Sequence, residues 1–75
     1  MTKLPRITGI DLLRALKRNG WQEVRQEGSH VQLKHPSKPG RVTVASHRGD
    51  ILNPKTLSRA LEQAGLTAEE LSKLL

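Results

Sequence analysis

Residues 30–46, HVQLKHPSKPGRVTVAS, hold the clearest structural signal in the chain. Two runs of alternating polar and apolar residues, His30 to His35 and Arg41 to Ser46, flank the Pro- and Gly-rich segment 36–40. Alternation with a period of two is typical of strands with one buried face, and Pro and Gly favour turns. The stretch therefore predicts an antiparallel β-hairpin. Its buried face is expected to carry Val31, Leu33, Val42 and Val44.

The register of this hairpin follows from keeping the apolar residues on one face. Paired residue numbers must then add to an odd total, and one such register pairs Leu33 with Val42 and leaves a four-residue loop, Pro-Ser-Lys-Pro. His30 then lies opposite Ala45 on the polar face. If the third strand runs on, His47 is a diagonal neighbour of His30. A shift by one full side-chain period would instead place the two histidines directly opposite each other, and both registers stay open here.

The segment before the hairpin supplies a further strand. Trp21 to Gln26 is expected to be extended, although its alternation is imperfect, and Gly28 with Ser29 provides the turn into the next strand. Turn chemistry requires no histidine at the position that follows. His30 is therefore either a reactive group or an ordinary polar residue of an exposed strand.

A helix is expected before the strands. Thr8 to Asp11 matches a capping box, in which a hydroxyl and a carboxylate three residues apart each accept a free backbone N–H. Asn19-Gly20 should end this helix. Its apolar stripe is expected to comprise Ile10, Leu13 and Leu16, with Leu12 and Ala15 beside them.

Two more helices are expected after the strands. Asn53 is a good N-cap, Pro54 suits the first helical position, and Gly65 should end the helix. A second capping box, Thr67 to Glu70, opens a short last helix. The buried positions of these two helices are expected to be Leu57, Ala60, Leu61 and Ala64, followed by Leu71, Leu74 and Leu75.

These elements predict one α+β domain over residues 1–75, with the order α-β-β-β-α and a short C-terminal helix. A three-stranded antiparallel sheet with one apolar face is satisfied when the helices cover that face. Trp21 is the only aromatic residue and is expected in the core. The uncovered face, left to solvent or to a partner, is expected to carry His30, Gln32, Lys34, Arg41 and Thr43.

The composition bounds the possible functions. A chain of 75 residues builds only a thin core, which leaves no room for an internal ligand cavity. The absence of cysteine excludes disulfides and thiolate metal sites. We see no signal-peptide pattern and no segment long enough to cross a membrane, so a cytoplasmic location is expected.

The charge is basic and unevenly distributed. The net charge is +6, and residues 1–60 hold 12 basic and 4 acidic side chains, whereas residues 61–75 hold 1 and 3. A basic body with an acidic tail is typical of nucleic-acid binders. A basic surface that only aids solubility is the alternative.

Several short motifs follow one another in a fixed order. They are Leu4–Gly9, Asn19–Trp21, Val24–His30, His35–Pro36, Val42–Val44, His47, Thr56–Leu61 and Gln63–Glu70. In this order, and in a chain of this length, they resemble the HicA-type mRNA interferase toxins, also called the YcfA-like family. The chain departs from that family in Asn53 to Thr56, which lacks the usual Gly, and in Val31, where a second histidine or an aromatic is frequent.

The resemblance implies a fold like that of a double-stranded-RNA-binding domain. It also implies an RNA-cleaving toxin that depends on one histidine, matched here by His30. Such a toxin is neutralised by a HicB-type antitoxin, so a hetero-oligomeric toxin–antitoxin complex is expected.

Histidine chemistry fits this expectation. RNA carries its own nucleophile, so a metal-independent endoribonuclease needs a base for the 2′-hydroxyl, an acid for the leaving 5′-oxygen and cations for the phosphate. Histidine ordinarily titrates at about pH 6.5, and we expect His30 to act as the general base or acid. Candidate auxiliaries are Ser29 and His47, the latter as partner acid, phosphate contact or plain loop residue. We expect His35 to be structural or incidental.

Five basic residues are candidate RNA contacts. Lys34 and Arg41 project from the polar sheet face, and Arg25, Arg48 and Lys55 lie near strand and helix ends. For each of them a plain solvated charge is an equal alternative. No cofactor is expected, and no metal, because alternation places His30 and His35 on opposite faces.

Two other functions compete with the toxin. One is a non-catalytic RNA-binding module of the same fold. The other is an interaction protein whose exposed sheet face or edge docks a partner.

Overall fold

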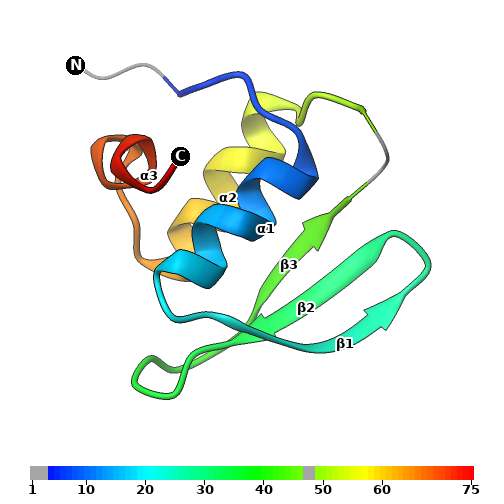
Figure 1. The fold of residues 1–75 in the computed structure, drawn as a ribbon, viewed down its shortest axis with the longest axis vertical. Helices are drawn as coiled ribbons and strands as arrows, with labels where there is room; N and C mark the ends of the chain where they lie inside the picture. Colours follow the sequence, from blue (N-terminus) through cyan, green and yellow to red (C-terminus); the bar gives the residue numbers. More distant parts are fainter. Residues whose placement is uncertain (1–3, 47–48) are drawn as a thin grey trace.

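The computed structural model describes residues 4–46 and 49–75, and its elements follow the predicted order. Figure 1 shows three helices gathered on one side of a three-stranded sheet. The α+β architecture predicted from the sequence is therefore confirmed. The elements are α1 (Gly9–Arg18), β1 (Gln22–Glu27), β2 (His30–Lys34), β3 (Val42–Ala45), α2 (Pro54–Ala64) and α3 (Ala68–Leu74).

The hairpin of β2 and β3 has the first of the two predicted registers. Leu33 pairs with Val42 and His30 pairs with Ala45, in an antiparallel ladder. Both strands are shorter than predicted, because His35 and Arg41 fall outside them. His47, and with it the predicted neighbour of His30, lies outside the described residues. The apolar side chains of the hairpin are almost fully buried: Val31, Leu33, Val42 and Val44.

Strand β1 lies at the edge of the sheet, in the order β1-β2-β3. Its register shifts between Glu23 and Arg25, so Val24 is an extra residue in a β-bulge. The bulge explains the imperfect alternation of this segment. The strand begins one residue later than predicted, because Trp21 leaves the ladder and enters the core, where its side chain is 1% exposed.

Helix α1 begins with the predicted capping box. The Thr8 hydroxyl accepts from the Asp11 N–H at 3.1 Å, and the Asp11 carboxylate accepts from the Thr8 N–H at 3.1 Å. These bonds hold the pKa of Asp11 below its ordinary value, because they stabilise the charged form. The helix starts against the sheet: a Cβ atom on Gly9 would lie 2.2 Å from the carbonyl oxygen of Ala45.

The prediction that Ile10 belongs to the buried stripe of α1 is wrong. Its side chain is 39% exposed, although the rest of the predicted stripe is buried. The buried arc is centred between Leu12 and Leu16, and a residue at position 10 projects from the opposite flank, next to Lys17.

Helices α2 and α3 complete the core. The Asn53 side chain caps α2 by accepting from the Lys55 N–H at 2.8 Å, and Gly65 ends the helix with a φ of 69°. All four predicted apolar positions of α2 are buried. In α3 only Leu71 is fully buried, and Leu75, which we expected in the stripe, is 48% exposed.

The core is one cluster shared by the sheet and the helices. The guanidinium of Arg18 ties α1 to α3 by donating to the carbonyl oxygen of Leu74 at 2.6 Å. In the part of the chain that the structure describes, no helix has the length and apolar character needed to span a bilayer.

Candidate functional site

His30 is the first residue of β2, and its side chain is exposed on the polar face of the sheet. Its backbone is held firmly: the carbonyl oxygen of the preceding Ser29 accepts from the Ser46 N–H at 2.7 Å and from the Ser46 hydroxyl at 3.1 Å. The imidazole itself makes no hydrogen bond or ion pair with residues 4–46 or 49–75. Hydrogen bonds thus hold the backbone beside a ring whose two nitrogens are not engaged by the described residues.

The turn before His30 explains this placement. Gly28 and Ser29 form a two-residue loop between Glu27 and His30, which are paired across β1 and β2. Gly28 has a φ of 58°, a conformation that glycine adopts without the strain of a side chain. The turn chemistry expected from the sequence is confirmed, and it sets His30 at the very start of the strand.

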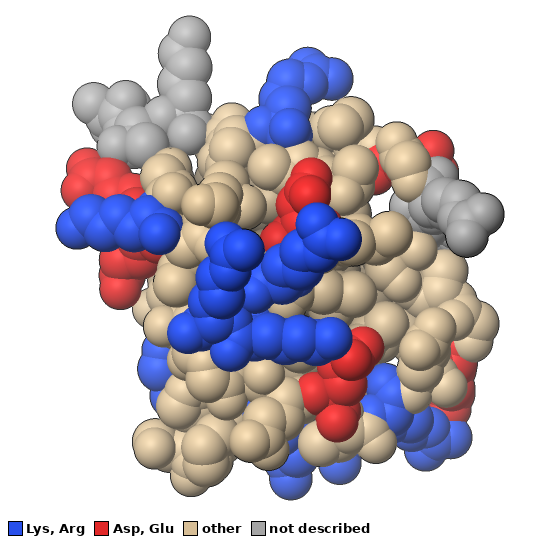
Figure 2. Space-filling model, in the orientation of Figure 1, with Lys and Arg blue, Asp and Glu red and all other residues tan. Residues whose placement is uncertain are grey.

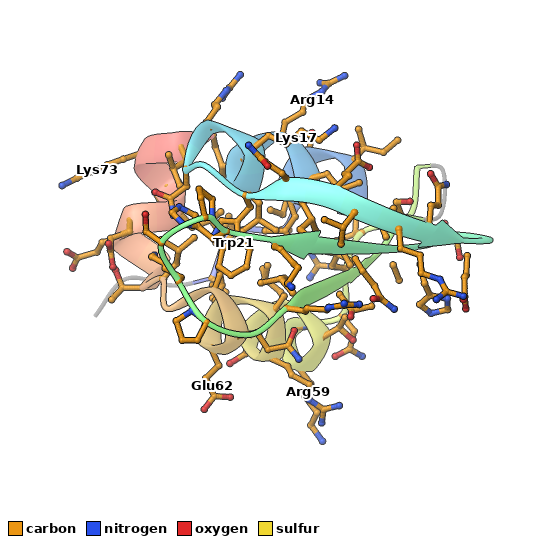
Figure 3. All side chains as sticks on the ribbon, turned by 90° about the horizontal axis from the view of Figure 1, so that it is seen from below. Arg14, Lys17, Trp21, Arg59, Glu62 and Lys73 are labelled. Carbon is orange, nitrogen blue, oxygen red and sulfur yellow. The ribbon has the colours of Figure 1, made fainter. Side chains whose placement is uncertain are left out.

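A groove of about 200 Å³ extends from His30 between the polar sheet face and α2. Figure 3 shows α2 on the β3 side of the sheet and α1 on the β1 side, so α2 stands as a wall beside the edge strand. The sequence predicted that the polar sheet face is left uncovered by the helices. In the structure, α2 covers part of its border at β3. The groove is lined by His30, Thr43, Ala45, Thr56, Arg59, Ala60 and Gln63.

Gln63 fastens the wall of the groove to the sheet. Its side-chain oxygen accepts from the backbone N–H of Thr43 at 3.3 Å. This N–H points away from β2, since β3 is an edge strand and every second amide of such a strand has no partner in the ladder. The bond holds α2 and β3 in register on either side of the groove.

The groove lining favours an anion. Its polar groups are one imidazole, one guanidinium, two hydroxyls and one amide, and none of the described lining residues is Asp, Glu, Phe, Tyr or Trp. Arg59 is the cation among them. Such a set suits a phosphate or a sugar hydroxyl better than the stacking of a base.

None of the four predicted RNA contacts that the structure describes lines this groove. Lys34 is exposed, and the Arg41 guanidinium donates to the Gln32 side chain at 2.8 Å on the polar face. Arg25 forms an ion pair with Glu27 on β1. Lys55 is exposed in the first turn of α2, and Arg48 lies outside the described residues.

The structure adds residues that the sequence analysis missed. Thr56, Arg59 and Gln63 follow one another at helical spacing, so they share one face of α2 beside its buried stripe. That spacing was a usable signal, but nothing in the pattern said that this face meets His30. Glu27 was also missed: it is the cross-strand partner of His30, from the β1 side.

His35 has a different environment. Its Nε2 lies 3.0 Å from the Asn19 carbonyl oxygen, its Nδ1 accepts from the Ser37 N–H at 3.0 Å, and its ring meets Trp21 edge-on. Both nitrogens are engaged, which agrees with the structural role expected for this residue. Among residues 4–46 and 49–75, no three His, Cys, Asp or Glu side chains gather closely enough to hold a metal ion.

Comparison with protein families places these residues in a known context. A model described as the HicA toxin of bacterial toxin-antitoxin systems matches residues 9–66. The match spans α1, the sheet and α2, and so includes every residue that lines the groove. No curated protein sequence matches the chain significantly.

Proposed function

This chain belongs to the HicA family of toxins from bacterial toxin–antitoxin systems, and on that premise we propose that it is an endoribonuclease with His30 as a proton-transfer group. One observation carries the proposal. An exposed imidazole, without a hydrogen-bond or ion-pair partner among residues 4–46 and 49–75, lines a groove whose described lining residues include a cation and no carboxylate.

The proposed reaction is transphosphorylation. The 2′-oxygen of RNA loses its proton to a base and forms a bond to the adjacent phosphorus, and the bond from phosphorus to the 5′-oxygen breaks. The leaving 5′-oxygen takes a proton from an acid, which leaves a 2′,3′-cyclic phosphate and a 5′-hydroxyl end. His30 serves as the base or as the acid in this step, because the reacting atoms can approach both ring nitrogens.

The cations around the groove hold neighbouring phosphates in this proposal. Lys34 lies four residues along β2 from His30, about 13 Å at the usual rise of a strand. With Arg41 it extends the basic path along the polar face. Arg25 and Lys55 are further candidate contacts, as is Arg48, which lies outside the described residues. Such contacts position the RNA backbone and carry no base specificity.

The direct test is cleavage of a defined RNA by the purified full chain in the presence of a chelator. We expect wild type to cut the RNA, to leave cyclic phosphate ends, and to leave uncut a matched strand that lacks 2′-hydroxyls. His30→Ala should bind the RNA and not cut it. Cleavage by His30→Ala at the wild-type rate would contradict the role of His30, and binding without cleavage by wild type would favour an RNA-binding module.

Family membership also implies an antitoxin partner. We propose that this partner is of the HicB type and that it neutralises the toxin by covering the groove at His30. The complex should then protect the RNA and exclude it from binding. An antitoxin complex that still binds RNA with the affinity of the free toxin would contradict this mode of neutralisation.

A further inference from the structure

We propose that Arg59 is a second catalytic residue, which binds the phosphate being cut from the α2 side of the groove while His30 transfers a proton from the sheet side. This inference rests on the proposed function, since it assigns the cation that the transphosphorylation step requires. It does not follow from the basic residues expected from the sequence, because none of those described lines the groove.

The position of Arg59 supports the assignment. It lies in the middle of α2, one turn after Thr56 and one turn before Gln63, and it forms part of the groove wall opposite His30. The helix is anchored on both sides of it. Ala60 and the leucines of its stripe are buried in the core, and Gln63 is bonded to β3. The Cα of Arg59 is therefore held at a fixed place relative to the imidazole.

The side chain of Arg59 is also uncommitted. It makes no hydrogen bond or ion pair with the described part of the chain, residues 4–46 and 49–75. Other cations are engaged: Arg25 pairs with Glu27, Lys17 pairs with Glu23, and the Arg41 guanidinium donates to a neighbouring amide. Arg59 can bind a phosphate without first breaking such a contact.

The guanidinium of Arg59 projects outward from α2 in Figure 3, while its residue contributes to the groove wall. The proposal therefore includes a rotamer change that brings the guanidinium over the groove when RNA binds. Exposed side chains make such changes in picoseconds to nanoseconds. The charge that draws it inward is the phosphate, since no carboxylate is present among the described lining residues.

Arginine suits this role for a geometric reason. Its planar guanidinium can donate two parallel hydrogen bonds to a phosphate, which lysine cannot reproduce. During transphosphorylation the two non-bridging oxygens of the phosphate gain negative charge. A bidentate donor at this place therefore stabilises the transition state more than the bound RNA, which is the condition for accelerating the reaction.

The test compares Arg59→Ala and Arg59→Lys with Arg14→Ala as the matched control. Arg14 is an exposed arginine on α1, and Figure 3 shows it on the opposite side of the molecule from Arg59. Figure 2 shows that Lys and Arg side chains also gather outside the groove, on the face turned to the viewer. For each full-chain variant, two quantities are measured with one RNA oligonucleotide. They are the single-turnover rate of cleavage and the affinity for the RNA at several salt concentrations. Circular dichroism checks that each variant keeps the wild-type thermal midpoint.

We expect Arg59→Ala to slow the cleavage step by about 10²- to 10³-fold, as the loss of one charge-stabilising donor does elsewhere. Arg59→Lys should recover part of this loss. The dependence of log affinity on log salt should become shallower by about 0.7 in Arg59→Ala, the value for one phosphate contact on a single strand. Arg14→Ala should leave the rate within about twofold of wild type, since no proposed contact is removed.

Two results would overturn the assignment in different ways. If wild type cleaves RNA and Arg59→Ala cleaves it at the rate of Arg14→Ala, Arg59 is not catalytic, and the role of His30 stands. If wild type cleaves no RNA, the proposed function and the role of Arg59 are both wrong.

Discussion

The two ends of β2 each carry a histidine, and the two are held in opposite ways. Just past the C-terminal end, His35 has both ring nitrogens in hydrogen bonds and an aromatic neighbour in Trp21. At the N-terminal end, His30 has a fixed backbone and a side chain with no partner in the described part of the chain. The two histidines that flank this strand thus differ: His35 is held by the fold, whereas the side chain of His30 makes no hydrogen bond or ion pair with the described residues.

This difference has a simple physical origin. His35 lies beside the turn that joins α1 to β1, where backbone groups of Asn19 are within reach and the Trp21 ring fills the space beneath. His30 follows the small residues Gly28 and Ser29 of the turn, and it pairs with Glu27 on the β1 side and with the small Ala45 on the β3 side. The groove lies on the side of Ala45, which is one of its lining residues.

The largest expected effect is that of a substitution at His30, at the N-terminal end of β2. His30→Ala should lower the cleavage rate by about 10²- to 10⁴-fold, the usual contribution of a general acid or base. Its thermal midpoint should stay within a few degrees of wild type, because an exposed side chain that makes no hydrogen bond or ion pair with the described residues adds little to stability. A large drop in the midpoint would show that His30 is a structural residue like His35 and would abolish the contrast.

The next effect concerns the support beneath the same end. Gly9→Ala places a Cβ against the backbone of Ala45, the residue that pairs with His30. Neither backbone segment can move away from this contact unless α1 shifts from the sheet. We expect a loss of about 3 kcal/mol in the free energy of unfolding, at the upper end for overpacked sites. Urea unfolding measures it, with Arg14→Ala on the same helix as the control. A loss below about 0.5 kcal/mol, the usual range for surface changes, would contradict this close packing.

A substitution at His35, just past the C-terminal end of β2, should lower the free energy of unfolding and leave the cleavage rate unchanged. His35→Ala removes hydrogen bonds at the Asn19 carbonyl and the Ser37 N–H and the contact with Trp21. We expect a loss of about 2 kcal/mol in the free energy of unfolding. The cleavage rate per folded molecule should remain near that of wild type. A rate as low as that of His30→Ala, measured where the variant is folded, would bring His35 into the reaction.

The smallest expected effect is a fall of the thermal midpoint at acid pH, which we attribute to two capping carboxylates and not to the histidines. Bonds from Thr8 and Thr67 hold the pKa values of Asp11 and Glu70 below their ordinary values of 3.8 and 4.5. A carboxyl with a lowered folded-state pKa adds stability above its ordinary pKa, and that stability is lost as the pH falls through the folded value. The thermal midpoint of wild type should therefore fall as the pH is taken below about 4.5.

The double variant Asp11→Asn, Glu70→Gln tests that origin. It should show a smaller fall of the midpoint between neutral and acid pH than wild type, because its capping groups no longer titrate. Glu62→Gln, which changes an exposed carboxylate outside the capping boxes, is the control. An unchanged slope in the double variant would assign the acid sensitivity to other groups, the histidines among them.

Much of the fold could be predicted from the sequence because its signals are local. The capping boxes at Thr8 and Thr67 act within four residues, and the parity of Leu33 and Val42 limits the hairpin to registers that keep both on one face, one of which the structure has. Ile10 was wrongly assigned to the core because residue spacing shows that a helix has an apolar face but does not show which residue lies at the centre of its buried face. That centre is set by what the helix packs against.

The candidate site was less predictable for the same reason. The position of His30 on the polar face follows from alternation along one strand. The groove does not, because it depends on α2 packing beside the edge strand β3, a contact between segments far apart in the chain. Sequence reasoning therefore found cations on the sheet, such as Lys34 and Arg41, and overlooked Arg59 and Gln63 on the helix.

The groove also has a consequence for the making of the protein. A nascent chain emerges from the ribosome with its N-terminus first, so β2 and β3 emerge before α2 does. A nascent chain that ends before Pro54 carries His30 and the sheet side of the groove, but the wall that bears Arg59 does not yet exist. The groove is therefore complete only after α2 has been translated and has packed against β3.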